Sequence, residues 1–133
     1  MGLFNKIFGD SEPKDTSENA VKWNYLTDLD QLSDIAGESQ SKPVIIFKHS
    51  TRCSISRMAL KQFENQYSIN AEKASPYFLD LLEYRPISNE IATRFDVVHQ
   101  SPQILLIKDG KCIYTASHSD IDADDLANKI KAI

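Results

Sequence analysis

The stretch KHSTRCSISR at residues 48–57 contains Cys53, the side chain with the clearest chemistry in this chain. The sequence around Cys53 has the first cysteine of a Cys-x-x-Cys redox motif, but Ser56 stands where that motif would carry its second thiol. A thiolate attacks disulfides, whereas a serine hydroxyl cannot form one. Once Cys53 holds a mixed disulfide, an outside thiol therefore has to release it. The sequence predicts a one-thiol redox site that depends on a second, external thiol.

The position of Cys53 favours the thiolate form of its side chain. The residue lies between an expected strand at 43–47 and an expected helix from about 54 to 67. At such a place a side chain meets amide groups that lack helical acceptors and the positive end of the helix dipole. The charge of Arg52, and that of Lys48 and His49 just upstream, act in the same direction. The alternative is a buried, unreactive cysteine, which a loop rich in serine, threonine and arginine disfavours.

Four other residues are weaker candidates for chemistry. Ser56 lies about one helical turn after Cys53, on the same face. Its hydroxyl can hydrogen-bond the thiolate, or it can serve only as a polar group in the first turn of the helix. Cys112 begins an expected strand, where a cysteine is usually a small core residue rather than a resolving thiol. His99 and His118 fit ordinary structural histidines better than supporting groups of the site.

The order of the secondary-structure elements predicts the fold class. The segment from the first strand to the second reads as β-α-β, which joins parallel strands by a right-handed crossover. The last two strands flank KDGK, whose Asp-Gly pair indicates a tight hairpin. We therefore predict an α/β, thioredoxin-like fold with a central mixed sheet of about four strands and helices on both faces. The expected elements are helix 27–36, strand 43–47, helix 54–67, strand 77–82, helix 86–95, strands 103–107 and 112–116, and a helix from about 122 to the end.

Apolar spacing within three of the helices predicts which side faces the core. The first helix is expected to open on Thr27 as its cap. Pro86 suits the first turn of the helix that it begins. The residues expected on the inner sides are Leu29, Leu32 and Ile35; Ile55, Met58, Ala59, Phe63 and Tyr67; and Leu126 and Ile130.

The chain divides into an N-terminal segment at residues 1–20 and a thioredoxin-like domain at residues 21–133. Apolar residues at 3–8 share one side of a short helix, followed by a polar linker at 10–19. The short helix either docks on a membrane surface or a partner, or packs on its own domain. We favour the second reading.

Composition limits the class of protein. The chain has 133 residues, 41% hydrophobic and 26% charged, with a net charge of −4, which fits one domain and disfavours nucleic-acid binding. No apolar run approaches the ~20 residues that span a membrane, and no export signal is visible. We therefore expect a cytoplasmic monomer with reduced thiols. No cysteine or histidine pair has the close spacing of a zinc site, so no metal is expected.

Four stretches together resemble the monothiol bacilliredoxin family, the YtxJ-like bacillithiol-system proteins of the thioredoxin superfamily. They are KHSTRCSIS at 48–56, EYRPISN at 83–89, HQSPQ at 99–103 and ASHSDI at 116–121. The resemblance covers roughly residues 23–133. The family usually has proline after the reactive cysteine, and this chain has Ser54. That departure can loosen the loop, but it leaves the nucleophile in place.

The resemblance implies that the protein removes bacillithiol, a small thiol with a malate group, from S-bacillithiolated client proteins. Cys53 would attack the mixed disulfide and retain the small thiol, and free bacillithiol or another redox partner would regenerate it. No bound cofactor is implied. The family also places a cis proline opposite the reactive cysteine. From this resemblance we expect Cys53 and Ser56 to act in catalysis. The residues expected to bind substrate are Thr51, Arg52, Arg85, Ser101 and Pro102. Arg57 is a further candidate for binding the malate group.

Two other functions remain open. A thioredoxin-like adaptor would capture client cysteines or peptides with little turnover, and Ser54 and the apolar N-terminal segment give it some support. A membrane-tethered redox protein, held through residues 3–8, is the weaker alternative.

Overall fold

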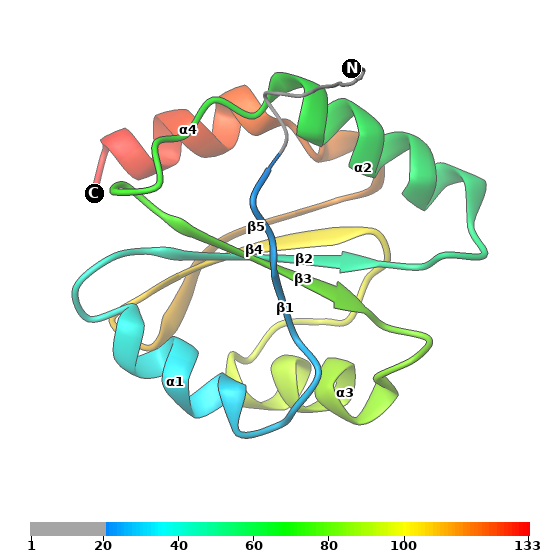
Figure 1. The fold of residues 1–133 in the computed structure, drawn as a ribbon, viewed down its shortest axis with the longest axis horizontal. Coiled ribbons are helices and arrows are strands. Elements are labelled where there is room, and N and C mark those ends of the chain that lie inside the picture. The colour runs from blue at the N-terminus through cyan, green and yellow to red at the C-terminus, as the bar shows by residue number, and fades with distance from the viewer. Residues whose placement is uncertain (1–20) are drawn as a thin grey trace, which may run out of the picture.

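The computed structural model describes residues 21–133, so the predictions for residues 1–20 lie outside the described residues. The described chain folds around one mixed sheet with the strand order β1-β3-β2-β4-β5 (Figure 1). Strands β1, β3 and β2 are parallel, while β4 runs antiparallel to β2 and to β5. The strands are β1 (Asn24–Tyr25), β2 (Val44–His49), β3 (Ser75–Asp80), β4 (Gln103–Lys108) and β5 (Lys111–Ser117).

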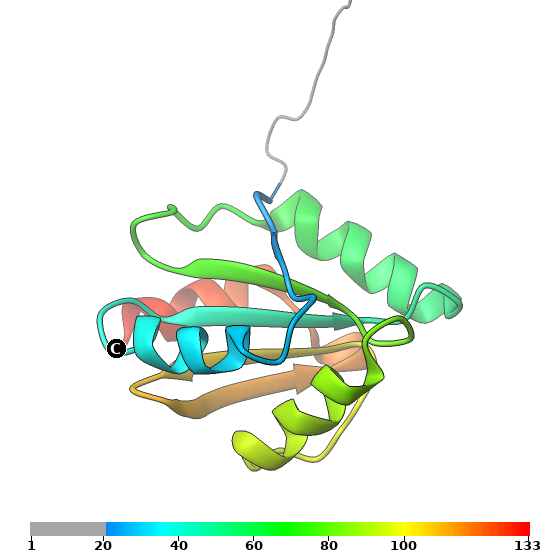
Figure 2. The same ribbon diagram turned by 60° about the horizontal axis from the view of Figure 1, so that its bottom comes forward.

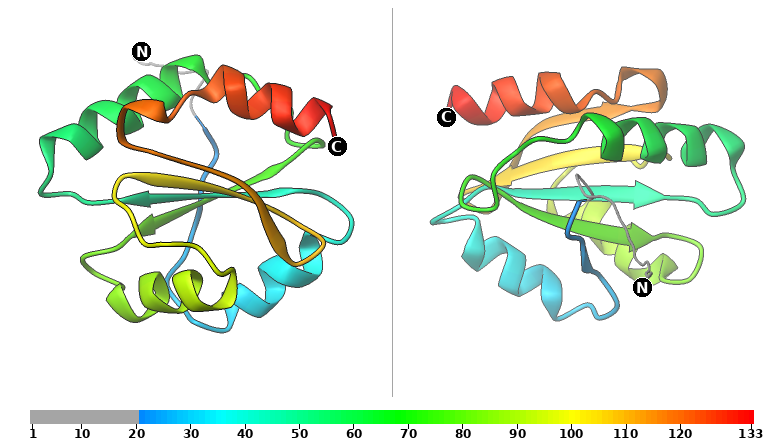
Figure 3. Two further views of the ribbon diagram at one scale, coloured as in Figure 1. Left: turned by 180° about the vertical axis from the view of Figure 1, so that it is seen from behind. Right: turned by 45° about the horizontal axis from the view of Figure 1, so that its top comes forward.

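Helices cover both faces of the sheet, which confirms the predicted fold class. Figures 1 and 3 show α2 and α4 on one face and α1 and α3 on the other, and Figure 2 shows the same layers from a second direction. No helix in the 21–133 range combines the length and apolar character that crossing a membrane requires. The helices are α1 (Gln31–Glu38), α2 (Ser54–Gln66), α3 (Arg85–Arg94), the 3-10 helix η1 (His118–Asp120) and α4 (Ala123–Lys131).

Strand β2 is buried on both faces because two cores meet on it. Val44 and Ile46 belong to the core under α1 and α3, whereas Ile45 and Phe47 belong to the core under α2 and α4. Successive side chains of a strand point to opposite faces, so a continuous apolar run is the expected pattern for a central strand. This alternation also fixes the directions of the last two residues of β2, which matter for the site.

Two local signals in the sequence have the predicted effect. Asp109 and Gly110 have φ angles of 53° and 77° between β4 and β5, the left-handed conformations that an Asp-Gly hairpin turn requires. Pro86 lies in the first turn of α3. In addition, the carboxylate of Asp122 caps α4 by accepting hydrogen bonds from the amides of Asp124 and Asp125.

Three predictions about helices and strands were wrong in detail. Helix α1 begins at Gln31 after Asp30 rather than at Thr27, so Leu29 precedes the helix and is 46% exposed. In α2, Ile55 and Met58 are 58% and 68% exposed, whereas Ser56 between them is fully buried, so these two apolar residues do not lie on the inner side of the helix. Figure 3 shows α2 along the same face as α4. The fifth strand, β1, was not predicted, since two residues carry no periodic pattern.

Candidate active site

The four stretches that resemble the bacilliredoxin family meet at one end of the sheet. His49 is paired with Asp80, so β2 and β3 end together. Lys48 is paired with Gln103, and Gln103 with Ser117, so β4 begins and β5 ends at the same edge. The loops that follow β2 and β3, the loop before β4 and the segment after β5 therefore border one site, beyond the arrowheads of β2 and β3 in Figure 1.

Cys53 occupies the N-cap position of α2 and is partly exposed. Its backbone is extended, with φ −107° and ψ 122°. The first bond of the helix runs from the amide of Arg57 to the Cys53 carbonyl at 3.0 Å. The amides of the three residues between them precede that bond, so they have no helical acceptor and face the loop of the cysteine. This arrangement confirms the predicted place of Cys53 at the start of the helix.

Ser56 is fully buried, and its hydroxyl has two partners other than Cys53. Its Oγ lies 2.8 Å from Nδ1 of His49 and accepts a hydrogen bond from the amide of Ser50 at 3.0 Å. These bonds join the start of α2 to the end of β2, and they hold the turn that carries Cys53. These contacts give the Ser56 hydroxyl a role in positioning the loop, while a bond to the thiolate stays a prediction.

His49 is buried, with 5% of its surface exposed, on the face of β2 that packs against α2. Burial lowers its pKa, and the opposing carboxylates of Asp80 and Glu64 only partly offset that effect. The imidazole is therefore mainly neutral near pH 7 and serves as a hydrogen-bond partner of Ser56. The sequence interpretation had counted His49 as a nearby positive charge. The alternation along β2, which puts His49 on the side of Phe47, was the signal for its real place.

Lys48 points to the opposite face of the sheet, the face of Val44 and Ile46 under α1 and α3. The side chain is fully buried, its Nζ has no hydrogen-bond partner within residues 21–133, and burial lowers its pKa to about 8. The sequence predicts a positive charge of Lys48 beside Cys53. The structure does not place it there, since α2 and its N-cap lie on the other face of the sheet.

The loop before β4 contains the expected cis peptide bond, between Ser101 and Pro102. Pro102 is buried, and its carbonyl accepts a hydrogen bond from the amide of His118 at 3.0 Å. The side-chain amide of Gln103 donates to the carbonyl of Val98 at 3.0 Å, which holds the loop against the sheet. His118 thus supports the loop through its backbone.

Thr51 and Arg52 are exposed beside Cys53 and line a shallow pocket of about 380 Å³. Asp80 and Glu83 line the same pocket, so its walls carry both signs of charge. Arg57 is exposed on α2 and donates from its guanidinium to the carbonyl of Thr51 at 3.2 Å. This contact braces the loop from outside, while Ser56 holds it from inside.

Arg85 and His99 are exposed at the same edge, on the side of α3. Nδ1 of His99 lies 3.5 Å from Oγ of Ser88. Burial lowers the pKa of His99, and the nearby charges of Lys48 and Arg85 lower it further. His99 therefore lies within reach of both positive charges.

Cys112 lies far from this site. It is paired with Ile107 on β5, while Ser117, at the other end of the same strand, borders the site. Five residues of strand span about 17 Å. The Cys112 thiol donates to the carbonyl of Tyr114 at 3.4 Å, and burial raises its pKa. The structure supports the interpretation of Cys112 as a core residue.

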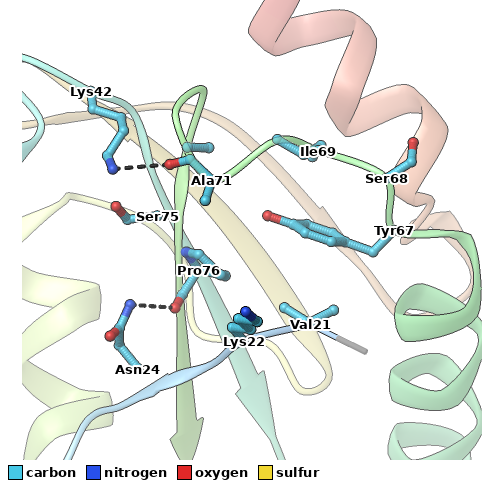
Figure 4. Close-up of a pocket in the computed structure, with 11 residues that line it drawn as sticks. Val21, Lys22, Asn24, Lys42, Tyr67, Ser68, Ile69, Ala71, Ser75 and Pro76 are labelled. Atoms are coloured by element: carbon cyan, nitrogen blue, oxygen red, sulfur yellow. Dashed lines mark hydrogen bonds between the residues drawn. The ribbon is translucent and has the colours of Figure 1, made fainter. Parts of the chain in front are cut away.

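A larger hollow of about 630 Å³ lies at the opposite end of the sheet. Figure 4 shows Lys42 donating to the carbonyl of Ala71 and Asn24 donating to the carbonyl of Pro76 across it, at 3.0 and 3.1 Å. Pro76 lies near the start of β3, whereas Cys53 follows the end of β2. This hollow is therefore separate from the cysteine site.

A five-stranded mixed sheet, a cysteine at the N-cap of the helix after a central strand, and a cis-proline loop at the same edge define a thioredoxin-fold protein with a single site thiol. Solved structures agree. A protein described by its thioredoxin fold and a suspected oxidoreductase activity is 30% identical, with a TM-score of 0.66 over 82% of this chain and 91% of that chain. A thioredoxin of Malassezia sympodialis is 23% identical, with a TM-score of 0.65 over 84% and 90%.

A mitochondrial thioredoxin of Saccharomyces cerevisiae is 20% identical and covers 84% of this chain and 95% of its own, with a TM-score of 0.62. The two thioredoxins show the fold alone. Residues 24–126 match the family model described as "Monothiol bacilliredoxin BrxC". The chain belongs to the monothiol bacilliredoxin family, and it has a thioredoxin-type role in thiol redox chemistry.

Proposed function

We propose that this protein is a monothiol oxidoreductase that removes a small thiol, bacillithiol, from mixed disulfides on client proteins. Membership of the bacilliredoxin family supports the substrate class. The place of Cys53 at the N-cap of α2 is the observation that carries the proposal. A partly exposed thiol at this position can be reached by a disulfide and lies next to amide groups that have no helical acceptor.

The proposed cycle has two exchanges. In the first, the Cys53 thiolate attacks the bacillithiol sulfur of the mixed disulfide. The disulfide bond of the client breaks, the client leaves as a thiolate that takes a proton from water, and Cys53 keeps bacillithiol in a new disulfide. In the second, the thiolate of free bacillithiol attacks this disulfide. The products are bacillithiol disulfide and the Cys53 thiolate, so the client is reduced and bacillithiol is oxidised.

The external thiol is needed because nothing near Cys53 can replace it. Ser56 cannot form a disulfide, and its hydroxyl is held by His49 and Ser50. Cys112 lies at the other end of β5. A mixed disulfide at Cys53 therefore persists until a thiol arrives from solution. Thr51, Arg52, Arg85, Ser101 and Pro102 border the site, and we propose that they bind the two substrates.

The test is multiple turnover on an S-bacillithiolated reporter protein with free bacillithiol in excess. The proposal expects release of many equivalents of reduced reporter per equivalent of enzyme. It also expects a bacillithiol adduct on Cys53, visible by mass spectrometry when free bacillithiol is withheld. Absence of the adduct together with no reporter release would refute the proposal.

An adaptor function is the second candidate, and the exposed side chains of Ile55 and Met58 favour it. They lie within the first two turns of α2, next to Cys53, and offer an apolar surface to a client. An adaptor would capture one equivalent of client or small thiol and then stop. The turnover experiment separates the two functions directly.

A further inference from the structure

Two side-chain polar atoms are buried without a hydrogen-bond partner among the described residues, and both lie at the edge of the active site. They are Nζ of Lys48 and Oγ of Ser101. Lys48 is two residues before Ser50, where the loop after β2 begins, and it is paired with Gln103, which follows Ser101 by two residues. Buried polar groups in proteins are nearly always paired, and a buried ammonium most of all. Two unpartnered donors at the same edge therefore point to a ligand with acceptor atoms.

We propose that Lys48 and Ser101 form a carboxylate-binding subsite for the small thiol that reacts at Cys53. The inference rests on the proposed function and deepens it by assigning a recognition site. An ammonium and a hydroxyl both donate hydrogen bonds, and a carboxylate accepts from both at once. The ligand chemistry that completes this pair of donors is thus an anion with oxygen acceptors.

Among residues 21–133, the sheet neighbours of Lys48 do not supply this acceptor. Lys48 lies between Leu79 and Gln103 in the sheet, and Leu79 has no acceptor. The amide of Gln103 is engaged with the loop, donating to the Val98 carbonyl and accepting from the Gln100 amide at 3.4 Å. An acceptor for Lys48 therefore has to come from outside.

The charge around Lys48 favours an anion. Arg85 and His99 lie near it, and both are exposed. The one hydrogen bond of His99 is long, at 3.5 Å from Ser88, so this side chain can yield to an entering ligand. The alternative pocket at Arg52 carries the carboxylates of Asp80 and Glu83, which repel a carboxylate. The side of α3 is therefore the better place for the acid group of the thiol.

The test measures the reaction of Cys53 with two small disulfides, in a Cys112→Ser background so that one thiol reacts. Dithiobis-nitrobenzoate carries a carboxylate on each half, and dithiodipyridine is neutral. The ratio of their second-order rate constants isolates the effect of the carboxylate. We expect Lys48→Met to lower this ratio by about tenfold, equivalent to ~1.4 kcal/mol, and Ser101→Ala to lower it by about threefold.

Lys61→Met is the matched control, because Lys61 is an exposed lysine on α2 and its loss changes the net charge equally. It should change the ratio by less than about twofold. A ratio that falls equally in both lysine variants, or that stays constant in Lys48→Met and Ser101→Ala, overturns the proposal. Thermal melting checks that each variant is folded. If Lys48→Met does not fold, the ratio measured for Ser101→Ala decides whether the subsite exists.

A second arm identifies the source of the carboxylate. One reporter protein is loaded with bacillithiol or with cysteamine, which has no carboxylate. If the subsite binds the small thiol, Lys48→Met raises the KM for the bacillithiol adduct by about tenfold and leaves the cysteamine adduct unaffected. An equal rise for both adducts would assign the carboxylate to the client and overturn the proposal. If the wild-type protein shows no turnover at all, the ratio of rate constants for the two small disulfides still tests the subsite, because that reaction needs only one exchange at Cys53.

Discussion

The two ends of the sheet contain the same types of residue, but these residues differ in their hydrogen bonds. At the far end, Lys108 donates to the carbonyls of Ser39 and Gln40 and to a carboxylate of Asp109, and the buried hydroxyl of Ser39 accepts from Gly110. At the site end, Lys48 is buried and its Nζ has no hydrogen-bond partner in the described part of the chain. Both ends hold a cysteine as well: one lies in a strand and one at the first turn of a helix.

This difference indicates where the protein is built for stability and where for binding. Satisfied polar groups contribute to stability, while unsatisfied ones cost stability and persist where function needs them. The far end follows the first pattern, with paired lysines and a cysteine held by the Tyr114 carbonyl. The site end combines the partly exposed thiol of Cys53, a buried lysine without a partner among the described residues, and exposed apolar side chains on α2. The predictions below test that contrast, from the largest effect to the smallest.

Exchange of either cysteine for serine should give the largest difference. Cys53→Ser should lower the rate of client reduction by roughly a thousandfold or more, because it removes the nucleophile. Cys112→Ser should retain the rate within about twofold, since Cys112 lies about 17 Å of strand from the site edge. Steady-state turnover of the bacillithiolated reporter measures both. Loss of turnover in Cys112→Ser with retention in Cys53→Ser would reverse the assignment of the two ends.

Replacement of lysine by methionine should have opposite signs at the two ends. Lys48→Met should stabilise the protein by about 3 kcal/mol near pH 7, because each pKa unit corresponds to about 1.4 kcal/mol and burial lowers the Lys48 pKa from 10.5 to about 8. Lys108→Met should destabilise it by about 1 kcal/mol through lost hydrogen bonds. Urea denaturation gives both values.

The effect of Lys48→Met should also depend on pH in a defined direction. Between pH 8 and 10.5 the unfolded chain binds more protons at Lys48 than the folded one, so wild-type stability rises with pH across this window. The cost of the buried ammonium is complete below pH 8 and absent above 10.5. The advantage of the variant should shrink accordingly. A constant difference from pH 7 to pH 10.5 would mean that Lys48 is not a buried titrating group.

The network that holds the cysteine loop should have a smaller effect. Ser56→Ala removes the partner of both His49 and the Ser50 amide and should cost about 1–3 kcal/mol of stability. Ser54→Ala on the same helix is the control, since Ser54 is exposed, and it should change stability by less than about 0.5 kcal/mol. Urea denaturation again compares them. Equal costs for the two variants would remove the role of Ser56 in the loop.

The sequence predicted most of the fold because the main elements have strong local patterns. The β-branched run of β2, the Asp-Gly turn and Pro86 each specify structure within a few residues. The two-residue strand β1 could not be predicted, since its pairing with Tyr77 and Phe78 depends on a strand some fifty residues away. Apolar spacing also predicted the wrong inner side for the start of α2, because the buried residue of its first turn is the polar Ser56 and not Ile55.

The site was predicted in position but not in its contacts. The place of Cys53 follows from a strand-to-helix junction, which is a local feature. The partners of Ser56 do not, because His49 reaches it only when β2 and α2 pack together. Lys48 was treated as a loop charge because its burial depends on α3 and on the loop before β4. Spacing along the chain indicates which residues are near, and packing determines which of them meet.

The most direct test of the central claim is the alkylation of the two cysteines in one sample of folded protein. At about pH 6, iodoacetamide should modify Cys53 at least tenfold faster than Cys112, because Cys53 lies in a loop at the N-cap of α2 while Cys112 lies within β5, where burial raises its pKa. Mass spectrometry of the two cysteine-containing peptides gives both rates from the same reaction. Equal rates, or faster modification of Cys112, would contradict the account.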